Sequence, residues 1–439
     1  MSSRQLYTAT LALLAVLLGS IAIVASATST QYGGSVPAPS GVILHSVCGD
    51  EAQGLLFAVG TDNTNGLVYR ITNLSSFPSS PLINQTPRSI GSQYKKLRFY
   101  VCEVVDNYLF VVGETEKGGG QLGGVILVYN ITNPDNPQLK AYTETGTGAA
   151  TQIAYRDVEV KKVDSTYYIY AQSVLVDGAT RLDNTSYTAG ADTMPGASSF
   201  IICSGINCNG YGISLYSDHL GVLYRDTNNR LNLTIFNISA GIPQTNPPPQ
   251  NVTVVSSFTG VRAAEAAYSG GFLVAAGTKL YRVYLDGGMW KLEEEFTIPD
   301  VFAGNAYAML IVEQGGAIAA YMFTQVDTAI NITAVDVVGK SIAYVDSVVD
   351  VGLGMDGYGD AYIVWVDDPG SKNIIAPASG YPYMVYTVTD GSSTSYLIYY
   401  DLTRGGTVPF PIPEASLLVV VGVVVAAGIA VAVLTRGKY

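Results

Sequence analysis

The 439-residue sequence contains two histidines, His45 and His219, and each lies in an apolar, strand-like segment. His219 follows Asp218, an order in which a carboxylate can polarise an imidazole. The sequence has no G-x-S-x-G elbow and no H-E-x-x-H helix, so neither histidine belongs to a catalytic pattern. We predict structural roles for both histidines and assign no catalytic or cofactor-binding residue.

Clusters of carboxylates are the other candidates for chemistry. Asp62–Gly66 and Asp356–Asp360 offer oxygen ligands of the kind that calcium prefers, but neither segment has the distal glutamate of a calcium loop. We expect turns there, with Ca²⁺ as the weaker alternative and no metal site assigned. Glu293–Glu295 is predicted to be a solvated strand edge, and Gly118–Gly124 an exposed hairpin loop. Paired acids for glycoside hydrolysis depend on spatial separation, which sequence does not reveal.

The elements that must position these residues are β-strands. Short runs rich in Val, Ile, Tyr and Leu alternate with Gly, Asn and Asp turns between residues 40 and 402, a pattern typical of an all-β domain. Strand–turn–strand units recur at separations of 44 to 57 residues. Their expected starts are Val42, Phe99, Arg156, Tyr211, Val261, Asn305 and Val349. About four strands per unit predict a β-propeller of about seven blades over residues 41–402.

The third strands of these units carry a family resemblance. Val125–Pro137 reads VILVYNITNPDNP and is followed by QLKAY, which resembles the LVIVD-type β-propeller repeat. The match is good over residues 98–142 and partial over 54–82. It implies a surface propeller fold without implying an activity. Two stacked β-sandwich domains are the rival architecture.

The propeller must close into a ring, and we expect strand Tyr396–Leu402 to complete a blade with Val42–Leu44. Residues 171–210 have few apolar runs and are predicted to be an insertion that carries binding. Ile242–Gln250 is rich in proline and is expected to be an extended loop.

Both ends of the chain indicate export to a membrane. Residues 1–27 have the order of a secretory signal peptide, with Arg4, an apolar run and a small-residue site; an uncleaved anchor is the alternative. Ala415–Leu434 is apolar throughout and long enough to cross a bilayer as a helix. Residues 403–414 form a Pro-rich stalk, and residues 435–439 a short cytoplasmic tail.

Four cysteines occur, all in the segment predicted to be extracellular, where an even number favours disulfides. Cys203 and Cys208 enclose a short loop, which leaves Cys48 with Cys102 as the expected second pair. A thiolate metal site is the alternative, although no C-x-x-C spacing supports it.

Acceptor sequons for N-glycosylation are dense in the same segment and predict a glycoprotein. They begin at Asn73, Asn84, Asn130, Asn184, Asn232, Asn237, Asn251 and Asn331.

Composition excludes one class of partner. The predicted exported segment loses three of the 23 basic residues and none of the 35 acidic ones, so its formal charge is −15. Such an acidic surface does not suit nucleic acid. We predict a single-pass membrane protein with an extracellular propeller for binding, adhesion or envelope structure, whose partner is a cell-surface protein or glycan. An exported sequence that is rich in sequons and tyrosine and poor in lysine resembles archaeal envelope proteins. A carbohydrate-active hydrolase and a solute-presenting receptor subunit are the alternatives.

Overall fold

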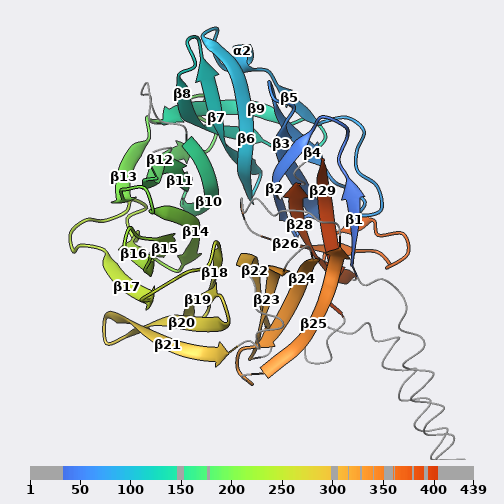
Figure 1. Cartoon of the computed structure of the whole chain (residues 1–439). Helices are drawn as coiled ribbons and strands as arrows, with labels where there is room; N and C mark the ends of the chain where they lie inside the picture. The colour runs from blue at the N-terminus through green and yellow to red at the C-terminus, as the bar shows by residue number, and fades with distance from the viewer. Residues whose placement is uncertain are drawn as a thin grey trace, which may run out of the picture.

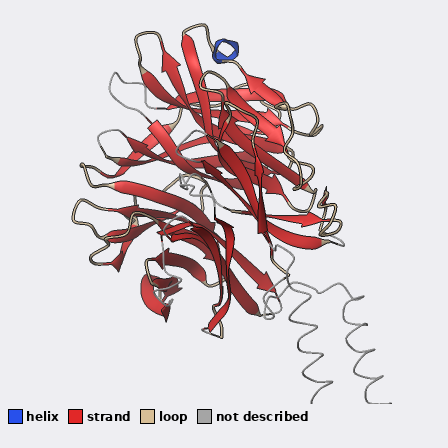
Figure 2. Cartoon of the chain, turned by 45° about the vertical axis from the view of Figure 1, so that its right-hand side comes forward, coloured by secondary structure: helices blue, strands red, loops and turns tan. Residues whose placement is uncertain are grey.

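The computed structural model shows an all-β molecule in which seven antiparallel sheets are arranged in a ring (Figure 1). It describes residues 33–145, 153–175, 178–297, 305–314, 316–326, 329–339, 341–350, 359, 361–377, 380–389 and 394–403. Figure 2 shows that these residues are almost entirely strands and loops, with one short helix, α2 (Pro87–Ile90). The predicted seven-bladed propeller is therefore confirmed.

Six of the blades are built from four consecutive strands each, in sequence order from the centre of the ring outward. Blade I comprises β2 (Ile43–Asp50), β3 (Leu55–Thr61), β4 (Gly66–Arg70) and β5 (Ile83–Gln85). Blade II comprises β6 (Tyr94–Val105), β7 (Tyr108–Lys117), β8 (Leu122–Asn130) and β9 (Gln138–Thr145). Blade III comprises β10 (Ile153–Val163), β11 (Thr166–Leu175), β12 (Thr180–Thr188) and β13 (Ser198–Cys203).

The next three blades repeat this order. Blade IV comprises β14 (Asn209–Tyr216), β15 (His219–Arg225), β16 (Leu231–Asn237) and β17 (Gln250–Val255). Blade V comprises β18 (Ala263–Tyr268), β19 (Gly271–Ala276), β20 (Lys279–Asp286) and β21 (Met289–Thr297). Blade VI comprises β22 (Asn305–Gln314), β23 (Ala317–Val326), β24 (Ala329–Asp336) and β25 (Ser341–Asp350).

Blade VII closes the ring with strands from both ends of the chain. It contains β26 (Tyr362–Val366), β27 (Ile374–Ile375), β28 (Tyr381–Thr389), β29 (Ser395–Asp401) and, beside β29, the N-terminal strand β1 (Gly33–Pro37). The expectation that the last strand pairs with Val42–Leu44 is wrong, because β2 is the inner strand of its own blade. The propeller therefore includes residues 33–37, which lie outside the predicted range of 41–402.

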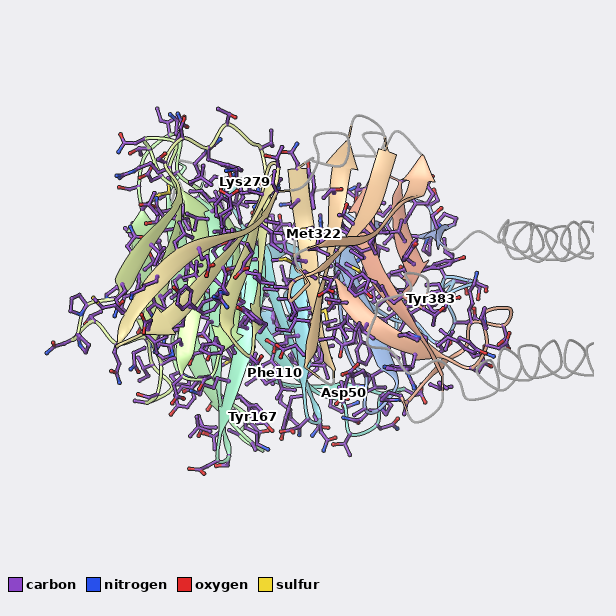
Figure 3. The ribbon with its side chains drawn as sticks, turned by 90° about the horizontal axis from the view of Figure 1, so that it is seen from below. Asp50, Phe110, Tyr167, Lys279, Met322 and Tyr383 are labelled. Carbon is purple, nitrogen blue, oxygen red and sulfur yellow. A yellow bond between two sulfur atoms is a disulfide. The ribbon has the colours of Figure 1, made fainter. Side chains whose placement is uncertain are left out.

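Two faces of the ring differ in the connections that they carry. Inner strands such as β2 begin at one face, which we call the entry face, and end at the other, which we call the exit face. Third strands such as β20 run in the same direction, because each strand pairs antiparallel with the one before it. Figure 3, a view from the side, shows Lys279 toward the entry face and Asp50 and Tyr167 toward the exit face.

The hydrophobic core is divided among the seven junctions between neighbouring blades. Side chains alternate along a strand, so each middle strand contributes to two junctions. On β7, Leu109 and Val111 pack against blade I, whereas Phe110 and Val112 pack against blade III. Each blade thus buries its apolar residues only against its neighbours, which makes closure of the ring a requirement for a complete core.

Most of the predicted unit starts match the inner strands, and two expectations are wrong. Val349 lies in β25, the outer strand of blade VI, whereas the described part of blade VII begins with β26. Residues 171–210 are not an insertion, because they contain β12, β13 and parts of their neighbours. The low apolar content of β12 has a physical reason: the strand buries Arg181, Asp183 and Asn184.

The predicted signal peptide (1–27), most of the stalk (404–414), the membrane span (415–434) and the tail (435–439) lie outside the described residues. Among the residues that are described, no helix has the length and apolar character needed to cross a membrane.

Candidate functional site

The inner strands share an irregularity close to the entry face. In β2, β6, β10, β14 and β22 the pairing with the second strand shifts by one residue, which leaves His45, Tyr100, Arg156, Tyr211 and Tyr307 as bulged residues. Arg262 immediately precedes β18 of blade V. Bulges redirect side chains and are frequent beside functional sites. We call His45, Tyr100, Arg156, Tyr211, Arg262 and Tyr307 the inner ring, since six successive blades contribute one residue each.

Neighbouring residues of the inner ring lie close together. The rings of His45 and Tyr100 have centroids 4.9 Å apart. The guanidinium of Arg262 lies over the ring of Tyr307, 5.7 Å from its centroid. Burial raises the pKa of the Tyr211 hydroxyl, and the nearby charges of Arg225, Arg262 and Arg156 oppose that rise. From Tyr100 to Tyr307, the inner ring therefore alternates aromatic and cationic residues from blade to blade.

Two further arginines extend this cationic region. Arg98 forms an ion pair with Glu114 and also interacts with the Tyr100 hydroxyl. Arg225 ends β15 and donates from Nε to the backbone carbonyl of Asn207 over 3.3 Å. With Arg156 and Arg262, these are four of the nine arginines in the residues that the structure describes. Arginine side chains are thus concentrated near the entry face of an acidic protein.

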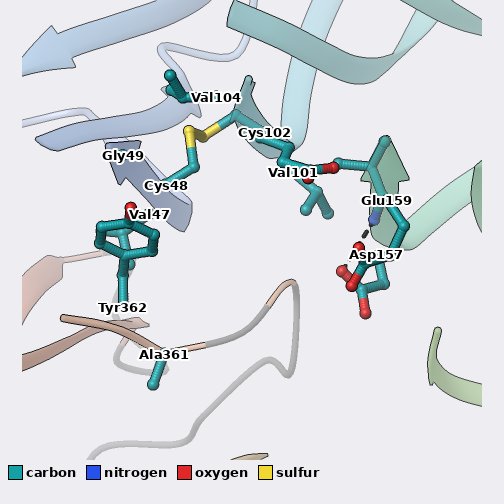
Figure 4. A pocket seen from close by; sticks show the side chains of 12 residues that line it. Val47, Cys48, Gly49, Val101, Cys102, Val104, Asp157, Glu159, Ala361 and Tyr362 are labelled. Carbon is teal, nitrogen blue, oxygen red and sulfur yellow. Dashed lines mark hydrogen bonds between the residues drawn. A yellow bond between two sulfur atoms is a disulfide. The ribbon is translucent and has the colours of Figure 1, made fainter. Parts of the chain in front are cut away.

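A cavity of about 260 Å³ lies on the exit side of the inner ring (Figure 4). The inner strands of blades I, II and III line it with the residues that follow the bulges, together with Ala361 and Tyr362 of blade VII. Cys48 and Cys102 form a disulfide at its wall, and the Tyr362 hydroxyl accepts a hydrogen bond of 3.1 Å from the Glu51 amide. The cavity thus has a rigid wall between blades I and II.

Carboxyl groups line this cavity from two inner strands. Asp157 and Glu159 of β10 line it together with Glu103 of β6. Burial raises the pKa of Asp157 to about 7, although the amides of Ile213 and Val158 hydrogen-bond to its two oxygens at 3.0 and 2.8 Å. Burial also raises the pKa of Glu159 well above its usual range. Near pH 7, Asp157 is therefore divided between the acid and the carboxylate, whereas Glu159 favours the neutral acid, which can donate a hydrogen bond.

Glu265 of β18 belongs to the same central region. Both Glu265 and Asp157 lie next to Gly212. A Cβ atom built on Gly212 would be 3.8 Å from Glu265 Oε1 and 3.3 Å from Asp157 Oδ2. Burial raises the pKa of Glu265 well above the usual range, and the charge of Asp157 adds to the effect. Across the residues with a described placement, however, no three His, Cys, Asp or Glu side chains converge to hold a metal ion.

The structure places the two histidines in different settings. His45 belongs to the inner ring and is 8% exposed. His219 begins β15, stacks on Tyr216 and meets the edge of Trp290, with ring centroids 6.4 and 5.2 Å away. Burial lowers the pKa of His219, while Asp218 forms an ion pair with Lys161. His219 therefore packs between aromatic side chains of blades IV and V.

The carboxylate segments singled out in the sequence are mainly turns and an outer edge. Asp62 accepts hydrogen bonds from the amides of Thr64 and Asn65 at 3.0 and 2.8 Å, which is the turn that was expected. Asp356–Asp360 lies outside the described residues except for Gly359. Glu293–Glu295 belongs to β21, the outer strand of blade V, but Glu295 is buried and pairs with Arg282 at 2.7 Å.

Both expected disulfides are present. Cys48 and Cys102 join the inner strands of blades I and II with Cα atoms 5.6 Å apart. Cys203 and Cys208 bridge the connection between blades III and IV, with Cα atoms 6.1 Å apart. The second bridge lies beside the cationic region, because Cys203 Sγ is 3.7 Å from the carbonyl oxygen of Arg225.

The predicted glycosylation sites differ in accessibility. Asn84 and Asn251 are exposed, and Asn73, Asn130 and Asn237 are half-buried. Asn184 and Asn232 are 6% and 1% exposed within middle strands, so sugar at these two positions does not fit the fold. The amide of Thr132 bonds to the Asn130 side chain, and that of Ser239 to the Asn237 side chain, each over 2.9 Å, so these two sequons also form turns. The side chain of Asn331 lies outside the described part of the structure.

Sequence reasoning missed the inner ring and the buried acids. The ring residues recur at the spacing of the repeat, which is the signal that could have revealed them, but their types differ from blade to blade. Asp157, Glu159 and Glu265 lie in ordinary strand patterns, and their proximity depends on how blades III and V are arranged around the axis.

No family model matches the sequence, and no curated protein matches it. Several solved structures are similar to the chain at about 10% identity. Penicillium chrysogenum alpha-L-arabinanase complexed with arabinobiose aligns with 71% of this chain and 99% of its own, at 10% identity and a TM-score of 0.45. Trypanosoma rangeli sialidase in complex with the inhibitor DANA aligns with 85% and 58%, at 10% identity and a TM-score of 0.42. The WD40 domain of SCAP from fission yeast aligns with 84% and 87%, at 10% identity and a TM-score of 0.40. At this level of similarity the alignments assign no role to any residue here.

Proposed function

We propose that this protein is a membrane-anchored extracellular propeller that binds its ligand at the entry face. The observation that carries the proposal is the position of the two ends of the ring. Gly33, at the start of β1, pairs with Tyr400, near the end of β29. Third strands end at the exit face, so both ends of the propeller lie there. An anchor at residues 415–434 would hold the exit face toward the membrane and present the entry face outward.

The chemistry of the entry face supports binding. Loops and half-buried polar groups on a rigid scaffold are the usual location of binding residues. The inner ring places Arg156, Arg262 and Tyr307 there in half-buried positions. The two disulfides support an oxidising, extracellular compartment, because such bonds are rare in the reducing cytosol.

The location can be tested on intact cells that carry the chain. Protease added outside should digest the propeller and leave the C-terminal segment with the membrane. The disulfides should be present before lysis, as shown by non-reducing peptide mapping with a thiol-blocking reagent in the buffer. Protection of the propeller in sealed cells would exclude the extracellular location.

Binding can be tested with the purified full-length chain in detergent on a glycan array. We expect retention on a subset of glycans and loss of that retention when Arg156 and Arg262 are both changed to Gln. Uniform absence of binding to glycans would favour a cell-surface protein as the partner.

A hydrolytic activity is the second candidate, and the buried acids favour it. Asp157 has a pKa of about 7, which is the range in which a carboxyl can serve as a general acid near neutral pH. The wild-type chain and an Asp157→Asn variant can be compared on chromogenic glycosides. Turnover that is lost in the variant would favour the enzyme, whereas no turnover in either would favour binding alone.

A further inference from the structure

We propose that the inner ring binds the carboxylate of an acidic saccharide. This inference rests on the proposed ligand-binding function and specifies its chemistry. It assigns Arg156 and Arg262 to the carboxylate and Tyr307 to the sugar rings.

The guanidinium groups of the inner ring come from blades on either side of Tyr211. Arg156 at the bulge of β10, Tyr211 at the bulge of β14 and Arg262 just before β18 occupy corresponding points on the inner strands of three successive blades. The charges of both arginines act on the Tyr211 hydroxyl. A guanidinium is planar and always charged, and its parallel N–H groups match the two oxygens of a carboxylate. Two such groups, contributed by the blades on either side of blade IV, can engage one carboxylate together.

The tyrosines of the inner ring differ in how far they are exposed. Tyr211 and Tyr100 are each 8% exposed and are held by packing, whereas Tyr307 is half-buried beneath Arg262. Aromatic side chains combine an apolar face with a polar tip, and they line sites that bind molecules with both kinds of surface. A sugar ring has such mixed surfaces, unlike a simple inorganic anion. The alternation of tyrosine and arginine therefore suits an acidic sugar better than a free ion.

The arginines of the inner ring lie in a protein that is acidic overall. The chain has a formal net charge of −12, and a basic region on such a protein attracts anions locally against the overall field. Below the ring, Glu159 lines the cavity and favours the neutral form, so it does not repel an anion strongly. A protonated carboxyl there can also donate a hydrogen bond to a sugar hydroxyl.

The test uses the full-length chain in detergent, with a tetramer of galacturonic acid as the probe. Calorimetry should show binding to the tetramer and at least tenfold weaker binding to its methyl ester, which has the same sugar rings but no charge. Acetate should bind at least tenfold more weakly than the tetramer, because it lacks the sugar. Binding should also weaken as salt concentration rises.

Variants assign the binding to the inner ring. Arg156→Gln and Arg262→Gln should each weaken binding of the tetramer about tenfold or more, whereas Arg156→Lys should recover part of the loss. Arg230→Gln is the matched control, because Arg230 lies on the same face but pairs with Asp226 outside the ring. Melting temperatures of all variants show whether each one is folded. Tyr307→Leu provides a further test that leaves every charge in place, and it should also weaken binding.

Three results would overturn the proposal: no binding of the tetramer by the wild type, equal binding of the tetramer and its methyl ester, or equal binding by the Arg156→Gln and Arg230→Gln variants. A chain that fails on galacturonate but still binds neutral glycans would contradict this inference and leave the binding function intact. Failure of the cell-surface experiment would contradict the location and leave the chemistry of the ring intact.

Discussion

Gly33 and Tyr400 pair across β1 and β29, so the first and last described strands of the chain are neighbours in one blade. The backbone of Gly34 lies directly against the ring of Tyr399, so a Cβ at position 34 would overlap the Tyr399 hydroxyl. The pairing completes blade VII and with it the junctions to blades VI and I. Closure of the ring thus depends on five residues at the N-terminus of the propeller.

Removing residues 33–37 should therefore lower the melting temperature of the whole propeller in a single transition. The deletion leaves β29 as an unpaired edge and weakens the adjoining junctions, on which the rest of the ring depends. Calorimetry of the purified chain measures the transition. Removing residues 245–248 from the exposed loop between β16 and β17 is the control and should have little effect. Two separate transitions after the deletion of 33–37 would show that the blades do not melt as one unit.

The sequence predicted the blades better than their closure. Phe99–Val112 and Arg156–Tyr170 are recognisable as strand pairs because polar turns interrupt apolar runs, and these turns lie where expected. Gly33–Pro37 has almost no apolar pattern, and its role as a strand comes from the long-range partner β29. For the same reason, residues near Val349 fit either an outer or an inner strand until the pairing with β24 is known.

Blade III contains a buried ion pair on which its fold should depend. Arg181 donates to the Asp183 carboxylate at 2.7 Å, and the two side chains are 8% and 0% exposed. The Tyr155 hydroxyl also donates to Asp183 over 3.0 Å. Asp183→Ala should lower the free energy of unfolding by about 3 to 5 kcal/mol, because it leaves a buried guanidinium without its counter-charge.

Urea denaturation of Asp183→Ala, Arg181→Met and the double variant measures this dependence. The double variant should be more stable than Asp183→Ala, since it removes the buried charge as well as its partner. If Asp183→Ala unfolds at the same urea concentration as the wild type, the ion pair contributes nothing to stability.

Raised pKa values of the buried acids give the propeller a defined pH dependence. Asp157 titrates near pH 7 when folded, compared with about 4 in an unfolded chain. Between these values the folded state holds a proton that the unfolded state has lost. The contribution of Asp157 to stability is therefore complete below pH 4 and declines toward pH 7, by up to about 1.4 kcal/mol per pH unit.

The comparison of Asp157→Asn with the wild type isolates this contribution. The melting temperature of the variant, relative to that of the wild type, should rise as pH increases from 4 to 7, because Asn does not ionise. Glu265→Gln should show the same trend, since burial also raises the pKa of Glu265. A relative melting temperature that is constant over this range would contradict protonation of the buried acid.

The disulfide between blades I and II should stabilise the chain more than the local one. Cys48 and Cys102 are 54 residues apart, compared with 5 for Cys203 and Cys208. Chain-entropy arithmetic predicts losses of about 4 and about 2 kcal/mol when the respective pairs are changed to Ala. Denaturation of the two double variants under non-reducing conditions measures the order of the losses, and equal or reversed losses would contradict it.

The central claim is that the exit face lies toward the membrane and the entry face away from it. All four cysteines are in disulfides, so a single new cysteine can carry a fluorophore. Thr64 and Ser79 are exposed in two loops of blade I, the first at the entry face and the second at the exit-face end of β4. Thr64→Cys and Ser79→Cys chains, labelled and reconstituted into vesicles that contain a lipid-bound quencher, test the claim directly. Our account predicts stronger quenching at position 79 than at position 64. Stronger quenching at position 64, or no quenching at either, would contradict it.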